Sequence, residues 1–241
     1  MNTATLASVE LRKMVNTRAG FWLQVAIVTL TVLVVVVRVV TGDAADHTFA
    51  AILDVAIRPA AILLPIAGVL LITSEWSQRT GMITFTLVPV RSRVLGAKLI
   101  AGLILAVGML ALSVAVAAAG ALVASAGVEG TWADAAPLIG QSAVYLTTGM
   151  IVGVAFGMVV PASTPAITAL FALPIAWTAV ASLSFFSEVA PWLDTRLALD
   201  RLPAEVLTGT QWAHVGTALA LWMLLPLALG VARITKREAA S

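Results

Sequence analysis

The stretch Phe21-Trp-Leu-Gln-Val-Ala-Ile-Val-Thr-Leu-Thr-Val-Leu-Val-Val-Val-Val-Arg-Val-Val40 decides the fold class. A helix needs about 20 apolar residues to cross a hydrocarbon core about 30 Å thick, and this stretch provides them. A cleaved signal peptide has a shorter apolar region that ends in a small-residue cleavage site, whereas this stretch ends at Arg38-Val-Val-Thr-Gly-Asp. We therefore expect a retained transmembrane helix.

Five further stretches have the same apolar character. They are Ile57–Ser74, Leu99–Ala126, Pro137–Val160, Pro165–Phe186 and Trp212–Ala232. The chain is 61% hydrophobic and 11% charged, with a mean hydropathy of +1.04, unlike a soluble domain. The stretches are continuous rather than alternating, which favours helices over transmembrane strands. The sequence predicts an all-α polytopic membrane protein, with six transmembrane helices in a single transmembrane domain over residues 1–241.

The charged residues predict the orientation of these spans, because Lys and Arg collect on the cytoplasmic side of membrane proteins. Basic residues fall in the leader 1–20, in the second loop and in the tail: Arg12, Lys13, Arg18, Arg79, Arg91, Arg93, Lys98, Arg233, Lys236 and Arg237. Acidic residues fall in the intervening loops: Asp43, Asp46, Asp54, Glu129, Asp134, Glu188, Asp194, Asp200 and Glu205. We expect both termini to be cytoplasmic, in a cell membrane of bacterial inner-membrane type.

Several kinds of chemistry are missing from the sequence. It has no Cys and no Gly-x-x-x-x-Gly-Lys-Ser/Thr loop for nucleotide phosphates. The predicted spans contain no Asp, Glu, His or Lys, and their two arginines, Arg38 and Arg58, lie near span ends. Proton- or sodium-coupled carriers usually place such groups near the bilayer middle. We therefore expect no buried ionisable group, no catalytic residue and no metal site. His47 beside Asp43 and Asp46 is either a weak metal site or part of a solvated loop.

The segments outside the spans are short. The longest, Ser187–Gln211, is too small to bury a hydrophobic core of its own. A soluble catalytic domain would therefore belong to another polypeptide. If the chain is a transporter, the energy for transport would come from that second polypeptide.

The second predicted cytoplasmic loop, between Ser74 and Lys98, is amphipathic. Gly81 offers a turn, and Pro89 ends an apolar run that contains Ile83 and Phe85. Apolar side chains in a short cytoplasmic loop favour a partner surface. The alternative is that the basic residues of this loop serve topology alone.

Two places in the sequence resemble the type-2 permease subunits of ABC exporters, a family also called ABCG-like or type V. One is the leader, Glu10-Leu-Arg-Lys-Met-Val-Asn-Thr-Arg18 followed by Trp22. It looks like the amphipathic interfacial helix that precedes the first span in that family. The other is the second loop, which looks like that family's loop between spans two and three. There the matching residues are Glu75, Arg79-Thr80-Gly81, Pro89-Val90, Arg91, Arg93, Gly96 and Lys98.

The resemblance implies a coupling helix between spans two and three that docks on a nucleotide-binding subunit. The implied partners are two cytoplasmic ABC ATPase subunits, which would hold ATP and Mg²⁺, and a second permease copy in a homodimer or heterodimer. The implied coupling residues are Glu10, Arg12, Lys13, Glu75, Arg79, Thr80, Gly81, Ile83, Phe85, Arg91, Arg93 and Lys98. It also implies a re-entrant segment before the last span, for which Ser187–Gln211 is the candidate, with an ordinary surface loop as the alternative.

The polar residues within the spans indicate a mainly apolar substrate path. Candidates are Gln24, Thr29, Thr31, Thr168, Thr178 and Ser182. Because they are few, the expected cargo is hydrophobic or amphipathic, and no nucleic acid is expected as a partner. Gly149, Gly153 and Gly157 repeat every four residues, which favours helix packing within the subunit. The same role is expected for Ala115, Ala119 and Val123.

The role of the leader helix and the function of the whole chain both remain open. The leader helix either docks a partner or only anchors at the membrane surface. The whole chain is either an exporter permease or a non-transporting scaffold that recruits a cytoplasmic partner. The third possibility is an energy-independent channel or carrier.

Overall fold

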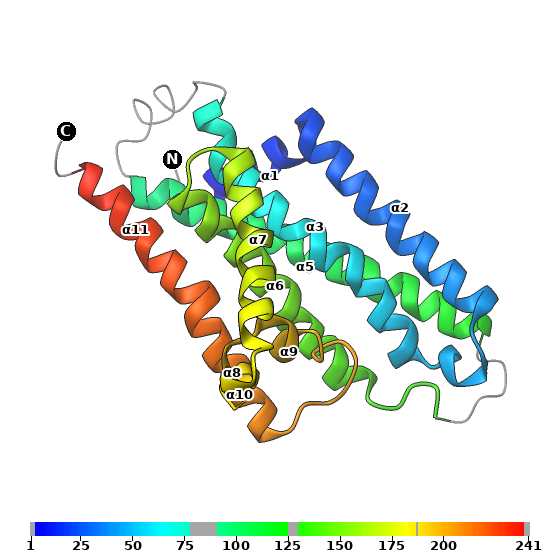
Figure 1. Ribbon diagram of the computed structural model, residues 1–241. Helices are drawn as coiled ribbons and strands as arrows, with labels where there is room; N and C mark the ends of the chain where they lie inside the picture. The colour runs from blue at the N-terminus through cyan, green and yellow to red at the C-terminus, as the bar shows by residue number, and fades with distance from the viewer. Residues whose placement is uncertain (1–2, 78–90, 125–129, 187, 239–241) are drawn as a thin grey trace.

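The computed structural model describes residues 3–77, 91–124, 130–186 and 188–238. These residues form helices and turns and contain no strand, and six of the helices are long and apolar enough to cross a membrane. The predictions of an all-helical fold and of six spans are confirmed (Figure 1). The chain is a multi-pass membrane protein.

Five of the six candidate spans are single helices. They are α2 (Arg18–Thr41), α3 (Phe49–Ser77), α5 (Arg91–Ala124), α6 (Ala135–Val159) and α7 (Ser163–Ala181). The last span joins α10 (Gly209–Leu219), the π-helix η3 (Ala220–Leu224) and α11 (Leu225–Glu238). The shorter elements are α1 (Thr3–Asn16), η1 (Ala44–His47), η2 (Ser184–Phe186), α8 (Ala190–Leu193) and α9 (Thr195–Leu199).

The helix bounds differ from the predicted spans by several residues, for instance at the start of α5, which begins at Arg91 and not at Leu99. The second span was predicted to begin at Ile57, but α3 begins at Phe49 and includes Asp54, which was expected in a loop. Asp54 accepts a hydrogen bond from Arg58 at 2.7 Å, one turn later, so the helix holds the two charges as a pair. The fifth span was predicted to reach Phe186, whereas α7 ends at Ala181 and a turn follows it.

The α3 and α6 helices form the centre of the bundle. In their most apolar windows 61% and 56% of residues are buried, against 17% in α2, α7 and the last span. Gly153 of α6 lies so close to α3 that a Cβ there would be 2.0 Å from the Pro65 carbonyl oxygen. Gly157 approaches Val69 in the same way, with the carbonyl oxygen of Val69 3.1 Å from the position of a Cβ. The prediction that these glycines serve internal packing is confirmed.

The equivalent prediction for α5 is wrong. Ala115 and Ala119 are exposed, and Val123 is 76% exposed. Another face of α5 is buried instead, at Ala117 and Ala121 among others. Small residues are frequent along α5, so their spacing alone did not single out the packed face.

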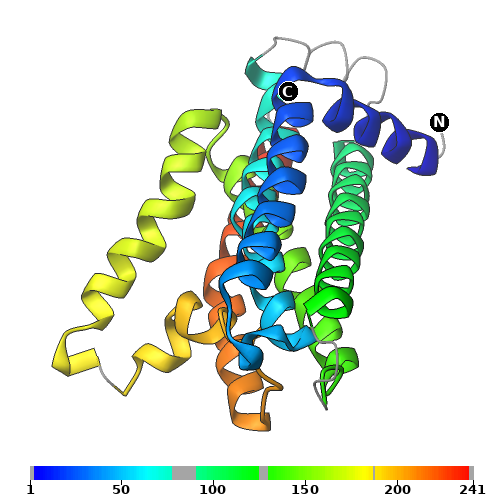
Figure 2. The ribbon, with the colours of Figure 1, turned by 90° about the vertical axis from the view of Figure 1, so that its right-hand side faces the viewer.

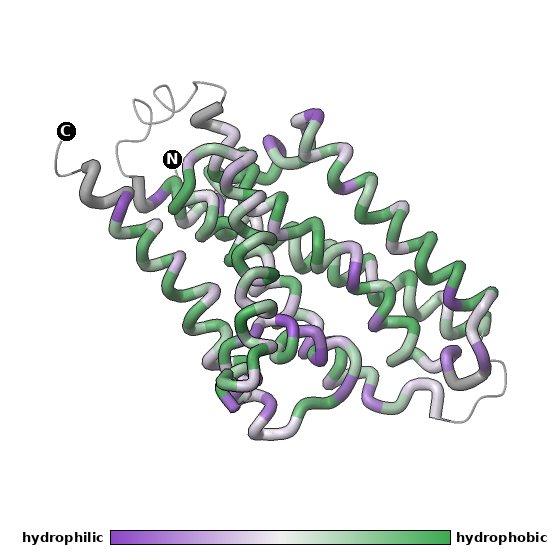
Figure 3. Tube along the Cα trace, viewed as in Figure 1, coloured by the Kyte–Doolittle hydropathy of each residue, from purple (hydrophilic) through white to green (hydrophobic). Residues whose placement is uncertain are grey.

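The two ends of the bundle differ in charge. The basic end holds α1, the last turns of α3 and α11 and the first turns of α5, so both termini lie at one end (Figure 2). The acidic end holds η1, residues 130–134, α8 and α9. Figure 3 shows mainly hydrophobic residues along the middles of the long helices and hydrophilic ones at the ends and around α9. In Figure 2, α7 diverges from the bundle toward the acidic end.

Candidate functional site

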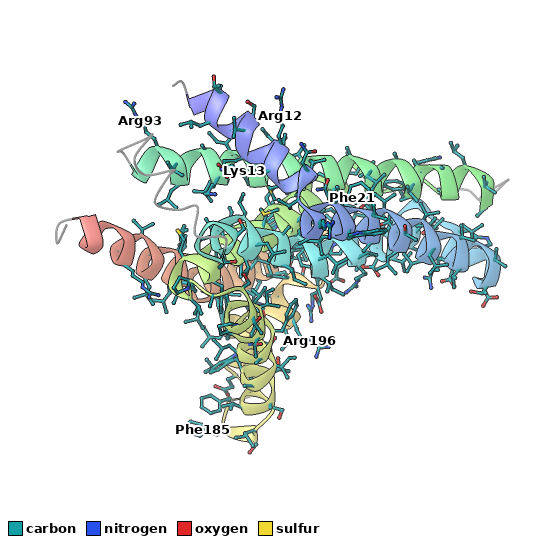
Figure 4. The ribbon with its side chains drawn as sticks, turned by 90° about the horizontal axis from the view of Figure 1, so that it is seen from above. Arg12, Lys13, Phe21, Arg93, Phe185 and Arg196 are labelled. Atoms are coloured by element: carbon teal, nitrogen blue, oxygen red, sulfur yellow. The ribbon has the colours of Figure 1, made fainter. Side chains whose placement is uncertain are left out.

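The α1 helix lies across the basic end and is amphipathic, as predicted for the leader. Its buried face contains Ala7, Glu10 and Met14, while Arg12 and Lys13 are exposed. Figure 4 shows α1 crossing α5 and meeting α2 near Phe21, with Arg12 and Arg93 at this end. The predicted coupling residues of α1 and α5 therefore share one end of the molecule.

A buried ion pair fastens α1 to α5. Lys98 of α5 donates to Glu10 Oε2 at 2.7 Å and to the Leu71 carbonyl of α3 at 3.0 Å. Lys13 donates to the other carboxylate oxygen, Glu10 Oε1, at 2.5 Å. The residues Glu10 and Lys98 are 4% and 3% exposed. Three helices are thus joined through one carboxylate and one ammonium group.

The Glu10 carboxylate is held in its ionised form. Burial raises its pKa, but the charge of Lys98 and the hydrogen bonds from Lys13 and Lys98 lower it by more, so the net pKa lies below the ordinary value of 4.5. The expectation of no buried ionisable group is therefore wrong at this position. The side chains of Glu10 and Lys98 face each other inside the chain, so both hold α1 in place rather than present a surface to a partner.

The remaining predicted coupling residues fall into two groups. Glu75 lies in α3, and Arg91 and Arg93 lie in α5, with Arg93 exposed. The others lie outside the described residues, namely Arg79, Thr80, Gly81, Ile83 and Phe85, as does the predicted coupling helix between spans two and three.

The predicted path residues do not share one cavity. Gln24 lines a cavity of about 450 Å³ at the basic end, where it donates to the carbonyls of Met14 and Gly20. Thr178 and Ser182 line a cavity of about 490 Å³ at the acidic end, between α7 and the α8–α9 segment. Thr29 and Thr168 are exposed on α2 and α7, and Thr31 is buried and donates to the Ala56 carbonyl at 3.4 Å.

The α8–α9 segment and the turn after it are folded onto the bundle at the acidic end. Gln141 of α6 donates to the carbonyls of Leu202 and Glu205 at 2.8 and 2.7 Å and accepts from the Leu207 amide at 2.9 Å. Tyr145 donates to Asp200 at 3.0 Å. These contacts were not predicted, because the residues are more than fifty positions apart in the sequence.

The last span also holds this segment. The Trp222 indole, within the π-helix, donates to the Leu193 carbonyl at 2.8 Å, and Thr217 donates to the Trp192 carbonyl at 2.6 Å. The π-helix therefore lies where α8 is attached, and π-helical turns are frequent at functional sites. Sequence alone gave no signal for it.

Replacing Gln141 with leucine is expected to lower the free energy of unfolding by about 1–3 kcal/mol, the cost of leaving a buried polar group unpaired. The substitution removes the acceptor of the Leu207 amide and the donor to two carbonyls. Thermal unfolding in detergent measures the loss. Gln211→Leu is the matched control, because its hydrogen bonds are exposed and its loss should be smaller. We call these three hydrogen bonds of Gln141 the Gln141 clamp; equal losses in both variants would contradict it.

The surroundings of the two histidines, His47 and His214, do not form a metal site in the described part of the chain. Next to His47, Asp46 pairs with Arg38 at 2.7 Å and accepts from the Asp43 amide at 3.3 Å. His214 packs edge-on against Trp192, with ring centroids 4.4 Å apart. Within the described ranges, no group of three His, Asp or Glu side chains is placed to hold a metal ion.

Comparison with known proteins adds no relative to this picture: the chain matches no protein-family model, and no curated protein sequence is significantly similar to it.

Proposed function

We propose that this chain is the membrane-spanning permease subunit of an ATP-driven ABC exporter. In this proposal it pairs with a second permease copy, binds two cytoplasmic ATPase subunits, and forms half of a pathway for a hydrophobic or amphipathic cargo. The ATPase subunits hold ATP and Mg²⁺. The basic end faces the cytoplasm, where the positive-inside preference would place it.

The observation that carries the proposal is the arrangement of the basic end. An amphipathic helix lies across it, fastened by the Glu10–Lys98 pair, and its Arg12 side chain is exposed. The last turns of α3 and α11 end there too. Arg233 of α11 donates to the Val159 carbonyl at the end of α6, which ties the last span to the central helix. A movement of α1 at this end would therefore also displace the spans that are joined there.

Two features support a pathway that changes shape. The α7 helix is only lightly buried and diverges from α3 and α6 (Figure 2). The cavity of about 490 Å³ lies between α7 and the α8–α9 segment. In this proposal α8 and α9 belong to the re-entrant segment, and lipid or the second copy covers the exposed apolar faces of α2 and α7.

Affinity purification of the tagged chain from its native membranes, followed by protein mass spectrometry, tests the proposal. The expected result is recovery of an ATPase chain that carries a Gly-x-x-x-x-Gly-Lys-Ser/Thr loop, in an amount comparable to the tagged chain. A partner without such a loop would favour the scaffold function. Flux through the purified chain without nucleotide would favour an energy-independent carrier.

Charge reversal at Arg79 is expected to reduce the recovered ATPase about tenfold, while membrane insertion stays normal. The expected size is that of one close interfacial ion pair lost, about 1.5 kcal/mol or more. Arg196→Glu is the matched control, because it makes the same reversal at the acidic end, where the side chain is 68% exposed. Equal recovery from the Arg79→Glu variant and the unaltered chain would remove Arg79 from the coupling surface.

A further inference from the structure

A cavity of about 450 Å³ lies where α1 meets α2 at the basic end. One part of its lining is polar and comes from the corner between the two helices, including Lys13, Thr17 and Arg18. A second part is apolar and comes from α1, α2, α3 and α5: Met14, Leu23, Ile27, Leu70 and Leu105. The polar residues Glu10, Gln24, Ser74 and Ser163 also line the cavity. The cavity therefore has a cationic side and an apolar interior. Its volume is within the range of small-molecule sites.

The neighbouring aromatic residues indicate the depth of this cavity in the membrane. Phe21 and Trp22 follow Arg18 at the start of α2 and are 50% and 66% exposed. Tryptophan gathers at the headgroup level of membranes, and amphipathic helices such as α1 lie in the same layer. The cationic side thus lies near the headgroups, while Ile27 and Leu105 lie deeper along the spans.

The charges around the cavity favour an anion. The Glu10 carboxylate in its lining is already neutralised by Lys98 and Lys13, which both donate to it. Arg18 adds a further cation that is exposed at the cavity.

The corner that makes the cavity is fixed by contacts within the chain. Gln24 donates to the Met14 carbonyl at the end of α1 and to the Gly20 carbonyl at the start of α2, both at 3.2 Å. The Thr17 hydroxyl accepts from the Gly20 amide at 3.2 Å and caps α2. A ligand would therefore enter a pre-formed site and would not have to order it.

We propose that this cavity binds one anionic phospholipid. Its phosphate lies against Arg18 and Lys13, and one acyl chain enters the apolar interior between α1, α2, α3 and α5. The lipid matches both parts of the lining, whereas a soluble anion would leave the interior unfilled and a zwitterionic lipid would bring no net charge to Arg18. The inference depends only on the membrane location of the chain, so it stands apart from the permease proposal.

The test uses the full-length chain in detergent, with lipid retention measured by native mass spectrometry and unfolding temperature as a second readout. Phosphatidylglycerol, phosphatidylcholine and inorganic phosphate are compared as probes. We expect one phosphatidylglycerol per chain to be retained, about tenfold more tightly than phosphatidylcholine, and to raise the unfolding temperature. Equal retention of both lipids, or the same stabilisation by inorganic phosphate, would overturn the proposal.

Three variants locate the site. Arg18→Gln should weaken phosphatidylglycerol retention about fivefold, the effect of one basic residue at a membrane surface. Arg12→Gln is the matched control: this side chain is exposed on the neighbouring helix α1, does not belong to the cavity lining, and should leave retention unchanged. Leu23→Trp should fill the interior and reduce retention while Arg18 stays in place. Unchanged retention in the Arg18→Gln variant would overturn the proposal.

Discussion

Gly153→Ala is expected to destabilise this protein more than any other single methyl addition in α6. The added Cβ would lie 2.0 Å from the carbonyl oxygen and 2.8 Å from the Cα of Pro65. Both atoms are backbone, so no side-chain rotation can relieve the overlap, and α3 must move away from α6. We expect a loss at or above the upper end of the about 1–3 kcal/mol that overpacking typically costs.

The measurement is thermal unfolding in detergent, combined with the yield of monodisperse protein. Gly140→Ala is the matched control on the same helix, because a Cβ at Gly140 meets no atom within 4 Å. That variant should be as stable as the unaltered chain, or slightly more so, since alanine favours the helix. If both variants unfold at the same temperature, the close contact between α3 and α6 is not as described.

Removing one partner of the Glu10–Lys98 pair is the second large effect that we expect. Both side chains are nearly inaccessible, at 6% and 4% exposure. Breaking a buried pair typically costs about 3–5 kcal/mol when the remaining charge has no compensation. Lys13 still donates to Glu10 after Lys98 is removed, so we expect a loss at or below the lower end of that range. Lys98→Met should therefore release α1 from α5 and lower the unfolding temperature. Proteolysis of the leader would report the release separately from global unfolding.

A double variant separates loss of the pair from loss of a charge. Replacing both residues by methionine removes both buried charges, and such replacements are often neutral or stabilising. We expect Glu10→Met combined with Lys98→Met to recover most of the stability lost in Lys98→Met. A double variant as unstable as the sum of the single ones would show that the two groups do not interact.

The pair also predicts a dependence on acid. The pKa of Glu10 in the folded protein lies below its ordinary value of 4.5, owing to Lys98 and Lys13, whose effects outweigh burial. Its contribution to stability is therefore complete above about pH 4.5 and is lost as the pH falls through the lower folded-state pKa. In Lys98→Met the acid-induced loss from this group should be smaller.

Sequence patterns predicted the number of spans and the packed face of α6 better than the polar contacts between helices. The apolar runs gave the six spans, and the four-residue spacing of Gly149, Gly153 and Gly157 gave the packed face of α6. These signals are local, since each is contained in one helix. The start of α3 was misplaced, because Asp54 interrupts the apolar run although Arg58 neutralises it.

The contacts that shape the candidate sites could not be predicted in this way. Glu10 and Lys98 are 88 positions apart, and the Gln141 clamp reaches turns more than 60 positions away. One local signal existed: Ala7, Glu10 and Met14 repeat on one face of α1, which is the face that α5 covers. A carboxylate on the buried face of an amphipathic helix implies a basic partner, but it does not say which one.

The central claim, that an ATPase in another chain drives this subunit, is tested most directly by ATP hydrolysis in proteoliposomes. An ATPase recovered in the affinity purification would be reconstituted with the chain, without it, and with the Arg79→Glu variant. The account predicts that the unaltered chain changes the rate of hydrolysis, whereas the variant changes it much less. A hydrolysis rate that is the same in all three preparations would contradict the account.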